Sequence, residues 1–248
     1  MTKRILVSQP QPSSEKSPYY DIQSKYDVEI VFRPFIKVAS VTAREFRSQH
    51  VNILDFTAVV FNSRHAIDNF FNMARELRID IPNDMKYFCV TEQVALYIQK
   101  YVQYRKRKVF FGTTGKMIDL LPQMVKHKTE KFFIPLSDVH NDDIANMMDS
   151  KNLVHTECVM YRTVSNDFEK GEPFDYDMII FFSPTGINSL LKNFPNFKKD
   201  YPNTVIGTFG SNTTRTAKES GLNVALEAPS PKYPSITAAL NDYIKSRG

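Results

Sequence analysis

The sequence predicts an α/β protein made of two doubly wound domains, each with a parallel sheet. Short runs that are apolar throughout alternate with stretches in which apolar residues recur at helical spacing. Runs without polar alternation suit strands that are buried on both faces of a parallel sheet. Strand and helix in regular succession are typical of α/β folds, and an internal repeat indicates two related halves.

The strands are expected at the apolar runs. Two of the intervening helices show a clear apolar stripe, one from Ala66 to Leu77 and the other from Ile187 to Phe194. The runs expected to be strands are Ile5–Val7, Val28–Phe32, Ala58–Phe61, Tyr87–Val90, Val109–Phe111, Phe132–Ile134, Met178–Phe182, Thr204–Gly207 and Val224–Leu226.

The internal repeat aligns residues 55–63 with residues 175–183. In both copies an aspartate opens a strand that ends in Phe-x-Ser, and an amphipathic helix follows. A second strand and helix follow each copy, over residues 88–101 and 206–220. A single match could arise by chance, but two successive matches indicate two halves of related architecture.

Composition and charge narrow the function classes. The chain of 248 residues is 42% hydrophobic and 24% charged, which is ordinary for a globular protein. The apolar start at Ile5–Val7 is too short for a signal peptide, and no run approaches the roughly 20 residues of a membrane span. Cys89 and Cys158 lie in apolar runs, which favours buried thiols in a reducing compartment. We therefore expect a cytoplasmic protein without membrane contact.

The densest basic segment is Arg105–Lys108, directly before the strand expected at Val109–Phe111. We interpret it as a solvated turn, because neither zinc-finger spacing nor an RNA-binding signature accompanies it. Nucleic-acid binding is not expected. The net charge of +5 suits a polyanionic small molecule instead.

Three strand–helix junctions carry the candidate binding residues. Ser63 and Ser183 each stand where a strand ends and a helix begins, and a hydroxyl there caps free N–H groups of the first turn. The same helix ends attract carboxylates, and ligands of open α/β sheets bind beyond the carboxyl ends of the strands. The third junction, Gly210–Thr214, combines a glycine that permits close backbone approach with Ser, Asn and Thr caps. Nucleotide binding is only weakly suggested there, because both nucleotide-loop fingerprints are missing.

No conventional catalytic cluster can be read from the residues. The five histidines lack the spacing of a metal site, and the chain has no G-x-S-x-G elbow. Tyr161 lies in the extended run Cys158–Val164, where an aromatic is by default a core residue. Composition and spacing alone therefore indicate a two-domain α/β protein with loops that suit anions.

Six short motifs follow one another along nearly the whole chain. They are Ile5–Pro10, Phe61–Ser63, Tyr161–Thr163, Phe181–Gly186, Phe209–Thr214 with Gly221–Leu222, and Glu227–Pro229. As an ordered set they resemble the uroporphyrinogen-III synthase family, whose motifs read roughly I-L-V-T-R-P, F-T-S, Y-R-T, F-F-S-P-S-G, I-G-P-T-T-A…G-L and an acidic-Pro element. Departures occur at Thr91–Ala95, Pro135–Asp138 and Asn212, which leaves the role of the middle loops open.

The resemblance implies two doubly wound domains joined by a two-stranded β-ladder. The first domain would be discontinuous, with residues 1–35 and 166–248, and the second would comprise residues 36–165. The linker strands would lie near residues 28–38 and 153–164. These two segments are long and β-rich in the sequence, and no Gly- or Ser-rich linker is present.

The resemblance also implies an activity, the dehydrative cyclisation of hydroxymethylbilane to uroporphyrinogen III with inversion of the last pyrrole ring. Such a cyclising hydro-lyase of haem biosynthesis would act without cofactor or metal, as a monomer. The phenol of Tyr161 would protonate the leaving hydroxyl. The residues implied to hold the substrate are Ser63, Ser183, Thr185, Gly186, Gly210, Ser211, Asn212 and Thr213.

Two other functions share part of this pattern. A non-enzymatic two-domain clamp for an anionic small molecule would use the same fold and helix starts, but it would bind the tetrapyrrole without changing it. A Rossmann-type nucleotide enzyme would require the Gly-rich fingerprint that the chain lacks.

Overall fold

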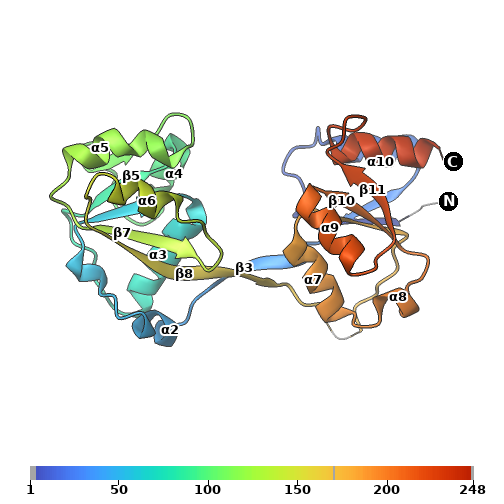
Figure 1. The fold of residues 1–248 in the computed structure, drawn as a ribbon, viewed down its shortest axis with the longest axis horizontal. Coiled ribbons are helices and arrows are strands. Elements are labelled where there is room, and N and C mark those ends of the chain that lie inside the picture. Colours follow the sequence, from blue (N-terminus) through green and yellow to red (C-terminus); the bar gives the residue numbers. More distant parts are fainter. Residues whose placement is uncertain (1–3, 170, 247–248) are drawn as a thin grey trace. The chain divides into compact units, whose positions relative to one another are not determined.

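The computed structural model describes residues 4–169 and 171–246, which form two compact units (Figure 1). Unit 1 comprises Met1–Lys37 and Val164–Gly248, and unit 2 comprises Val38–Thr163. The chain passes between the units within β3 (Ile36–Ser40) and within β8 (His155–Ser165). These two strands are hydrogen-bonded neighbours in one sheet, so the two connections form a ladder.

Unit 1 contains a parallel sheet in the order β11-β10-β9-β1-β2. Its central strand β9 is apolar throughout, and helices cover both faces of the sheet, the burial pattern of a doubly wound sheet. The strands are β1 (Arg4–Val7), β2 (Glu29–Phe32), β9 (Met178–Phe181), β10 (Val205–Phe209) and β11 (Val224–Ala228). On one face lie α1 (Pro18–Tyr26) and α10 (Ile236–Lys245), and on the other α7 (Pro184–Asn193), α8 (Phe197–Asp200) and α9 (Ser211–Glu219).

Unit 2 contains a sheet in the order β3-β8-β7-β4-β5-β6, in which the strands from β8 to β6 are parallel. The remaining strands are β4 (Ala58–Phe61), β5 (Lys86–Cys89), β6 (Val109–Phe111) and β7 (Phe132–Ser137). Residues of α2 (Ala43–Ser48), α3 (Arg64–Glu76) and α4 (Glu92–Tyr97) pack on one face, and those of α5 (Leu121–Lys126) and α6 (Asp143–Asp149) pack on the other.

The repeat seen in the sequence corresponds to equivalent places in the two sheets. Strands β4, β5 and β6 stand side by side in unit 2, as β9, β10 and β11 do in unit 1. Helix α3 follows β4 as α7 follows β9, and α4 follows β5 as α9 follows β10. The predicted fold class, α/β with two doubly wound parallel sheets and a strand ladder, is confirmed, and every predicted strand run overlaps a strand of the structure.

The extended stretch expected near residues 28–38 is divided into two strands, β2 and β3. The break falls at Arg33 and Pro34, where proline provides no N–H for a ladder. The Arg33 guanidinium stabilises the chain at this break. It donates to both carboxylate oxygens of Glu172, at 2.7 and 3.2 Å, and to the carbonyl oxygens of Pro34 and Asn166, each at 3.3 Å. The sequence pattern could not show the contacts with Glu172 and Asn166, because both residues lie far from Arg33 in the sequence.

Strand β8 carries a bulge, since Leu136 pairs with Val159 whereas Ser137 pairs with Tyr161. Next to the bulge, the Gln49 side chain makes the two hydrogen bonds that the backbone of a neighbouring strand would otherwise make. Its Nε2 donates to the Val159 carbonyl at 2.8 Å, and its Oε1 accepts from the Val159 N–H at 2.8 Å. Both backbone groups of Val159 are thus bonded without another strand.

Candidate functional site

The two serines predicted at strand–helix junctions occupy equivalent positions in the two units. Ser63 lies two residues after β4 and caps α3, with its Oγ accepting from the Ala66 N–H at 3.1 Å. Ser183 lies two residues after β9 and caps α7, with its Oγ accepting from the Gly186 N–H at 3.1 Å. Each hydroxyl keeps its own hydrogen as a donor toward a ligand. The cap role predicted for both residues is therefore present in the structure.

Thr185 and Gly186 lie in the first turn of α7 and differ in exposure. Thr185 is exposed, whereas Gly186 is buried. A Cβ on Gly186 would stand 3.0 Å from Cδ1 of Phe181, so the glycine is needed where α7 packs on β9. Of this pair, Thr185 is the residue whose side chain can reach a ligand.

Helix α9 begins differently from α3 and α7. Its N-cap is Gly210, with φ +96° and ψ 138°, a backbone conformation that suits glycine. Within the described residues no side chain caps this helix. Ser211 and Asn212 follow and are exposed. The start of α9 thus carries free N–H groups and the partial positive charge of a helix N-terminus.

Thr213 points into unit 1 rather than toward solvent, because only 2% of its surface is exposed. It shares the buried face of α9 with Ala217, four residues later. Thr214 is the residue that organises the turn: its hydroxyl lies 2.7 Å from the Thr208 hydroxyl and donates to the Gly210 carbonyl at 3.2 Å. The i, i+4 spacing of Thr213 and Ala217 in the sequence could have indicated the buried face.

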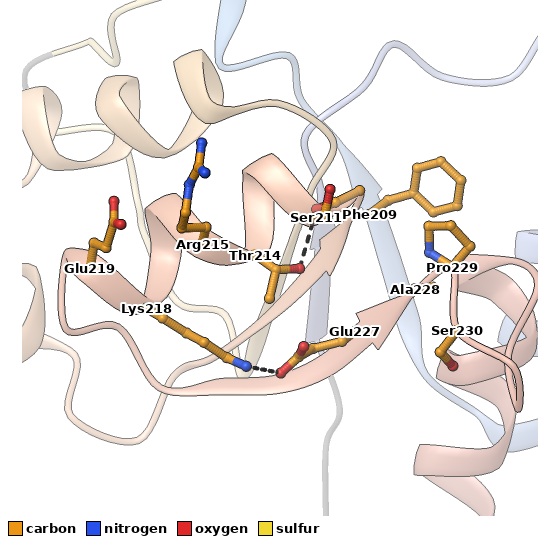
Figure 2. A pocket seen from close by; sticks show the side chains of 11 residues that line it. Phe209, Ser211, Thr214, Arg215, Lys218, Glu219, Glu227, Ala228, Pro229 and Ser230 are labelled. Atoms are coloured by element: carbon orange, nitrogen blue, oxygen red, sulfur yellow. Dashed lines mark hydrogen bonds and ion pairs between the residues drawn. The ribbon is translucent and has the colours of Figure 1, made fainter.

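A cavity of about 740 Å³ lies between α9 and the end of β11, entirely within unit 1 (Figure 2). Phe209, Ala228 and Pro229 contribute apolar surface. In the same lining, the Nζ of Lys218 on α9 contacts the Oε1 of Glu227 on β11 at 2.6 Å. The lining residues are Phe209, Gly210, Ser211, Thr214, Arg215, Lys218, Glu219, Glu227, Ala228, Pro229 and Ser230.

Gly210 and Ser211 of this lining were predicted from the sequence, whereas its two cations were not. Arg215 and Lys218 lie in the second turn of α9, beyond the junction motif. Arg215 is exposed, and its Nη2 donates to the Asn212 Oδ1 at 3.3 Å. Their i, i+3 spacing places both cations on one face of α9, but it does not show that this face lies beside β11.

Tyr161 lies on β8 in unit 2, with 8% of its surface exposed. Its ring belongs to the apolar cluster that includes Val41, Phe46 and Met160. Its carbonyl accepts from the Asp138 N–H at 3.0 Å. Among the described residues, no hydrogen bond engages its hydroxyl. Tyr161 and Ser63 belong to unit 2, whereas the other predicted site residues belong to unit 1.

The corresponding loops of unit 2 bond to their own side chains. The Thr91 Oγ1 caps α4 by accepting from the Val94 N–H at 3.3 Å. After β6, the Asp119 Oδ2 accepts from the Thr114 hydroxyl at 2.7 Å and from the N–H groups of Thr113 and Thr114 at 3.2 and 2.6 Å. The hydrogen bond from the Thr114 hydroxyl, followed by that from its N–H, lowers the pKa of the Asp119 carboxyl.

The two cysteines are buried and unpaired. Burial raises the pKa of the Cys158 thiol to about 12 and that of the Cys89 thiol further still. Both thiols therefore stay protonated and unreactive at neutral pH.

Within the described residues, no three His, Cys, Asp or Glu side chains are grouped so that they could hold a metal ion. A search of the same residues for a helix that combines the length and the apolar character of a membrane span finds none.

The comparisons with known proteins decide the family. A family model described as uroporphyrinogen-III synthase HemD matches residues 21–238. The chain belongs to this family. No curated protein matches the chain.

One solved structure of the family shares the fold, and a second is matched along its length. The crystal structure of uroporphyrinogen-III synthetase from Helicobacter pylori 26695 is similar with a TM-score of 0.56 at 13% identity, over 99% of this chain and 100% of that one. A mutant uroporphyrinogen III synthase from the extremely thermophilic bacterium Thermus thermophilus matches over 99% of this chain and 100% of its own, at 11% identity and a TM-score of 0.47.

The family model confirms the predicted family and the predicted class of activity, a cyclising hydro-lyase of haem biosynthesis that acts on a tetrapyrrole.

Proposed function

We propose that the chain converts hydroxymethylbilane into uroporphyrinogen III and that the loops around α9 in unit 1 hold carboxylates of the substrate. The uncapped start of α9 beside the cavity carries this proposal. Free N–H groups and the helix dipole favour anions there. Ser211 and Asn212 provide exposed polar side chains at the same helix start, and Ser183 provides a hydroxyl donor at the end of the neighbouring strand β9.

The reaction requires little covalent chemistry from the protein. The C–O bond to the terminal hydroxyl breaks, and protonation lets the oxygen leave as water. The pyrrole nitrogens stabilise the resulting cation, which the substituted carbon of the last ring attacks to give a spiro intermediate. This intermediate opens and recloses with the last ring inverted, and the carbon that closes the macrocycle then loses a proton, which balances the proton used to release water. The protein has to assist the departure of the hydroxyl group as water and hold the chain so that ring inversion is faster than direct closure.

Tyr161 is proposed as the proton donor for the leaving hydroxyl. Its phenol is the free polar end of an otherwise packed side chain, because no hydrogen bond from the described residues engages it. A phenol held by a rigid strand and not bonded to its own protein can donate to a ligand. The packing of its ring fixes the direction of that hydroxyl.

The function is tested by supplying freshly made hydroxymethylbilane to purified protein, without added metal or cofactor, and identifying the porphyrin isomer after oxidation. The type III isomer is expected. Type I product alone, the isomer that forms spontaneously, would contradict the proposal. A protein that binds the tetrapyrrole and leaves its isomer distribution unchanged would be a clamp.

Replacement of Tyr161 by Phe tests the proton donor. The ring and its packing remain, so the melting temperature should barely change, while turnover should fall about 10²-fold, the usual scale for general acid catalysis. A Tyr161→Ala variant is the matched control for packing and should lose about 3 kcal/mol or more of unfolding free energy. A Phe variant with full activity would remove Tyr161 from the mechanism.

We also propose that the protein works as a monomer in the cytoplasm. The two unpaired, buried thiols suit a reducing compartment. Sedimentation of the purified chain with and without the tetrapyrrole tests the oligomeric state, and a stable dimer in both conditions would contradict it.

A further inference from the structure

We infer that Arg215 is a substrate-specificity residue, which binds one acidic side chain of the tetrapyrrole in the cavity beside α9 while Lys218 neutralises Glu227. The inference rests on the proposed function and extends it to side chains beyond the junction motif. It assigns the cavity of about 740 Å³ to one pyrrole ring with its acidic arms.

The cavity has the two kinds of surface that such a ring needs. Phe209 and Pro229 present apolar side chains at one end of the lining, as Figure 2 shows. The hydroxyl groups of Ser211 and Ser230 and the Arg215 guanidinium are polar groups of the same lining. A flat, apolar ring whose acidic arms reach to polar groups matches this combination.

The lining carries four charged side chains, the cations Arg215 and Lys218 and the anions Glu219 and Glu227, and Arg215 is the cation that remains available to a ligand. The positive charge of Lys218 is engaged by Glu227 at 2.6 Å, so this pair contributes little net charge. Arg215 bonds the neutral amide of Asn212 at 3.3 Å, and within residues 4–169 and 171–246 no ion pair engages it. A guanidinium with free N–H groups binds a carboxylate through two parallel hydrogen bonds.

The repeated unit shows that a cation at this place is not needed for the fold. Arg215 is the fifth residue after the N-cap of α9, and the fifth residue after the N-cap of α4 is Leu96. Leu96 is 46% exposed, so an apolar side chain is tolerated at the equivalent surface of unit 2. The guanidinium of Arg215 is therefore available for a role in ligand binding.

Replacing Arg215 with Gln tests the inference, with calorimetric binding of uroporphyrinogen III, kept reduced, as the readout. A hydrogen bond to a charged group contributes enough that the dissociation constant should rise about tenfold or more. Arg75→Gln is the matched control, because Arg75 lies on α3 and its Nη2 bonds Asn72 three residues earlier, at 3.1 Å, as Arg215 bonds Asn212. Arg75 does not line the cavity, so its variant should bind within about twofold of the original protein.

A second pair of variants tests the role of Lys218. Lys218→Met leaves the Glu227 carboxylate unneutralised in the cavity and should weaken binding, whereas Lys218→Met combined with Glu227→Gln should restore it. Binding by Arg215→Gln within twofold of the original protein would overturn the inference, even if the original protein makes the type III isomer. Weakened binding by Arg215→Gln alongside type I product alone would support the pocket and contradict the proposed function.

Discussion

The two units share a strand–helix repeat but differ at the start of its second helix, α4 in unit 2 and α9 in unit 1. In unit 2 side chains of the chain itself occupy the backbone donors, because Thr91 caps α4 and Asp119 accepts three hydrogen bonds in the loop after β6. In unit 1 the helix equivalent to α4 starts at Gly210 and has no cap from any side chain that the structure describes. The comparison teaches that one copy of a repeat can use its loop donors for local stability while the other leaves them for a ligand.

Among changes at these helix starts, the largest effect on tetrapyrrole binding is expected from Gly210→Ala. The new Cβ has room, with the Thr213 Oγ1 as its nearest neighbour at 3.8 Å, but φ +96° is strained for alanine. Such strain costs about 1–3 kcal/mol and is relieved when the turn changes shape. The dissociation constant for uroporphyrinogen III, measured by calorimetry, should therefore rise about tenfold.

Thr91→Gly is the matched change in unit 2. It removes the cap of α4 and costs only a few tenths of a kcal/mol, because glycine is itself a tolerated cap. Tetrapyrrole binding should remain as in the original protein. Equal losses of binding in the Gly210 and Thr91 variants would show that both copies contribute to the substrate site.

The two serine caps give a smaller and more symmetrical effect on stability. Ser63→Ala and Ser183→Ala each remove a cap that accepts at 3.1 Å, and each should lower the free energy of unfolding by about 1 kcal/mol. Only Ser183→Ala should also raise KM strongly, because Ser183 lies in the same unit as the cavity. Denaturant titration and steady-state kinetics separate the two effects, and an unchanged KM in the Ser183 variant would restrict that serine to capping.

The smallest effect should come from Asp119→Asn and should depend on pH. The bonds from Thr114 lower the pKa of Asp119 in the folded protein, so its stabilising contribution is present above the unfolded pKa of roughly 4 and is lost as pH falls through the folded pKa. Melting temperatures of the original protein and the variant should differ by a constant amount near neutral pH. Below about pH 4 the difference should shrink steadily as pH falls toward the folded pKa, and a difference that stays constant from neutral pH into acid would contradict this assignment.

Much of the fold was predictable because it depends on local patterns. Apolar runs marked the strands, and the register of two Phe-x-Ser junctions marked the repeat. The capping roles of Ser63 and Ser183 also followed from their places between strand and helix. Tyr161 as proton donor remains a proposal, since its partner is the substrate.

The part of the site that could not be predicted depends on contacts between distant segments. Lys218 and Glu227 meet because α9 lies beside the end of β11, and nothing in their spacing shows this. Asp119 folds back onto Thr113 and Thr114, which turned a loop that could have bound anions into one that is already occupied. The sequence presents the donors of a loop but does not show which acceptor reaches them.

The Gln49 amide beside the bulge of β8 has a consequence for association between molecules. Its two bonds to Val159 satisfy a backbone donor and acceptor that would otherwise be open at that point of the strand. Open backbone groups along a strand invite another chain to add to the sheet, which is a route to aggregates. A single side chain after α2 thus occupies the backbone donor and acceptor with which a foreign strand would have to pair at this point of β8.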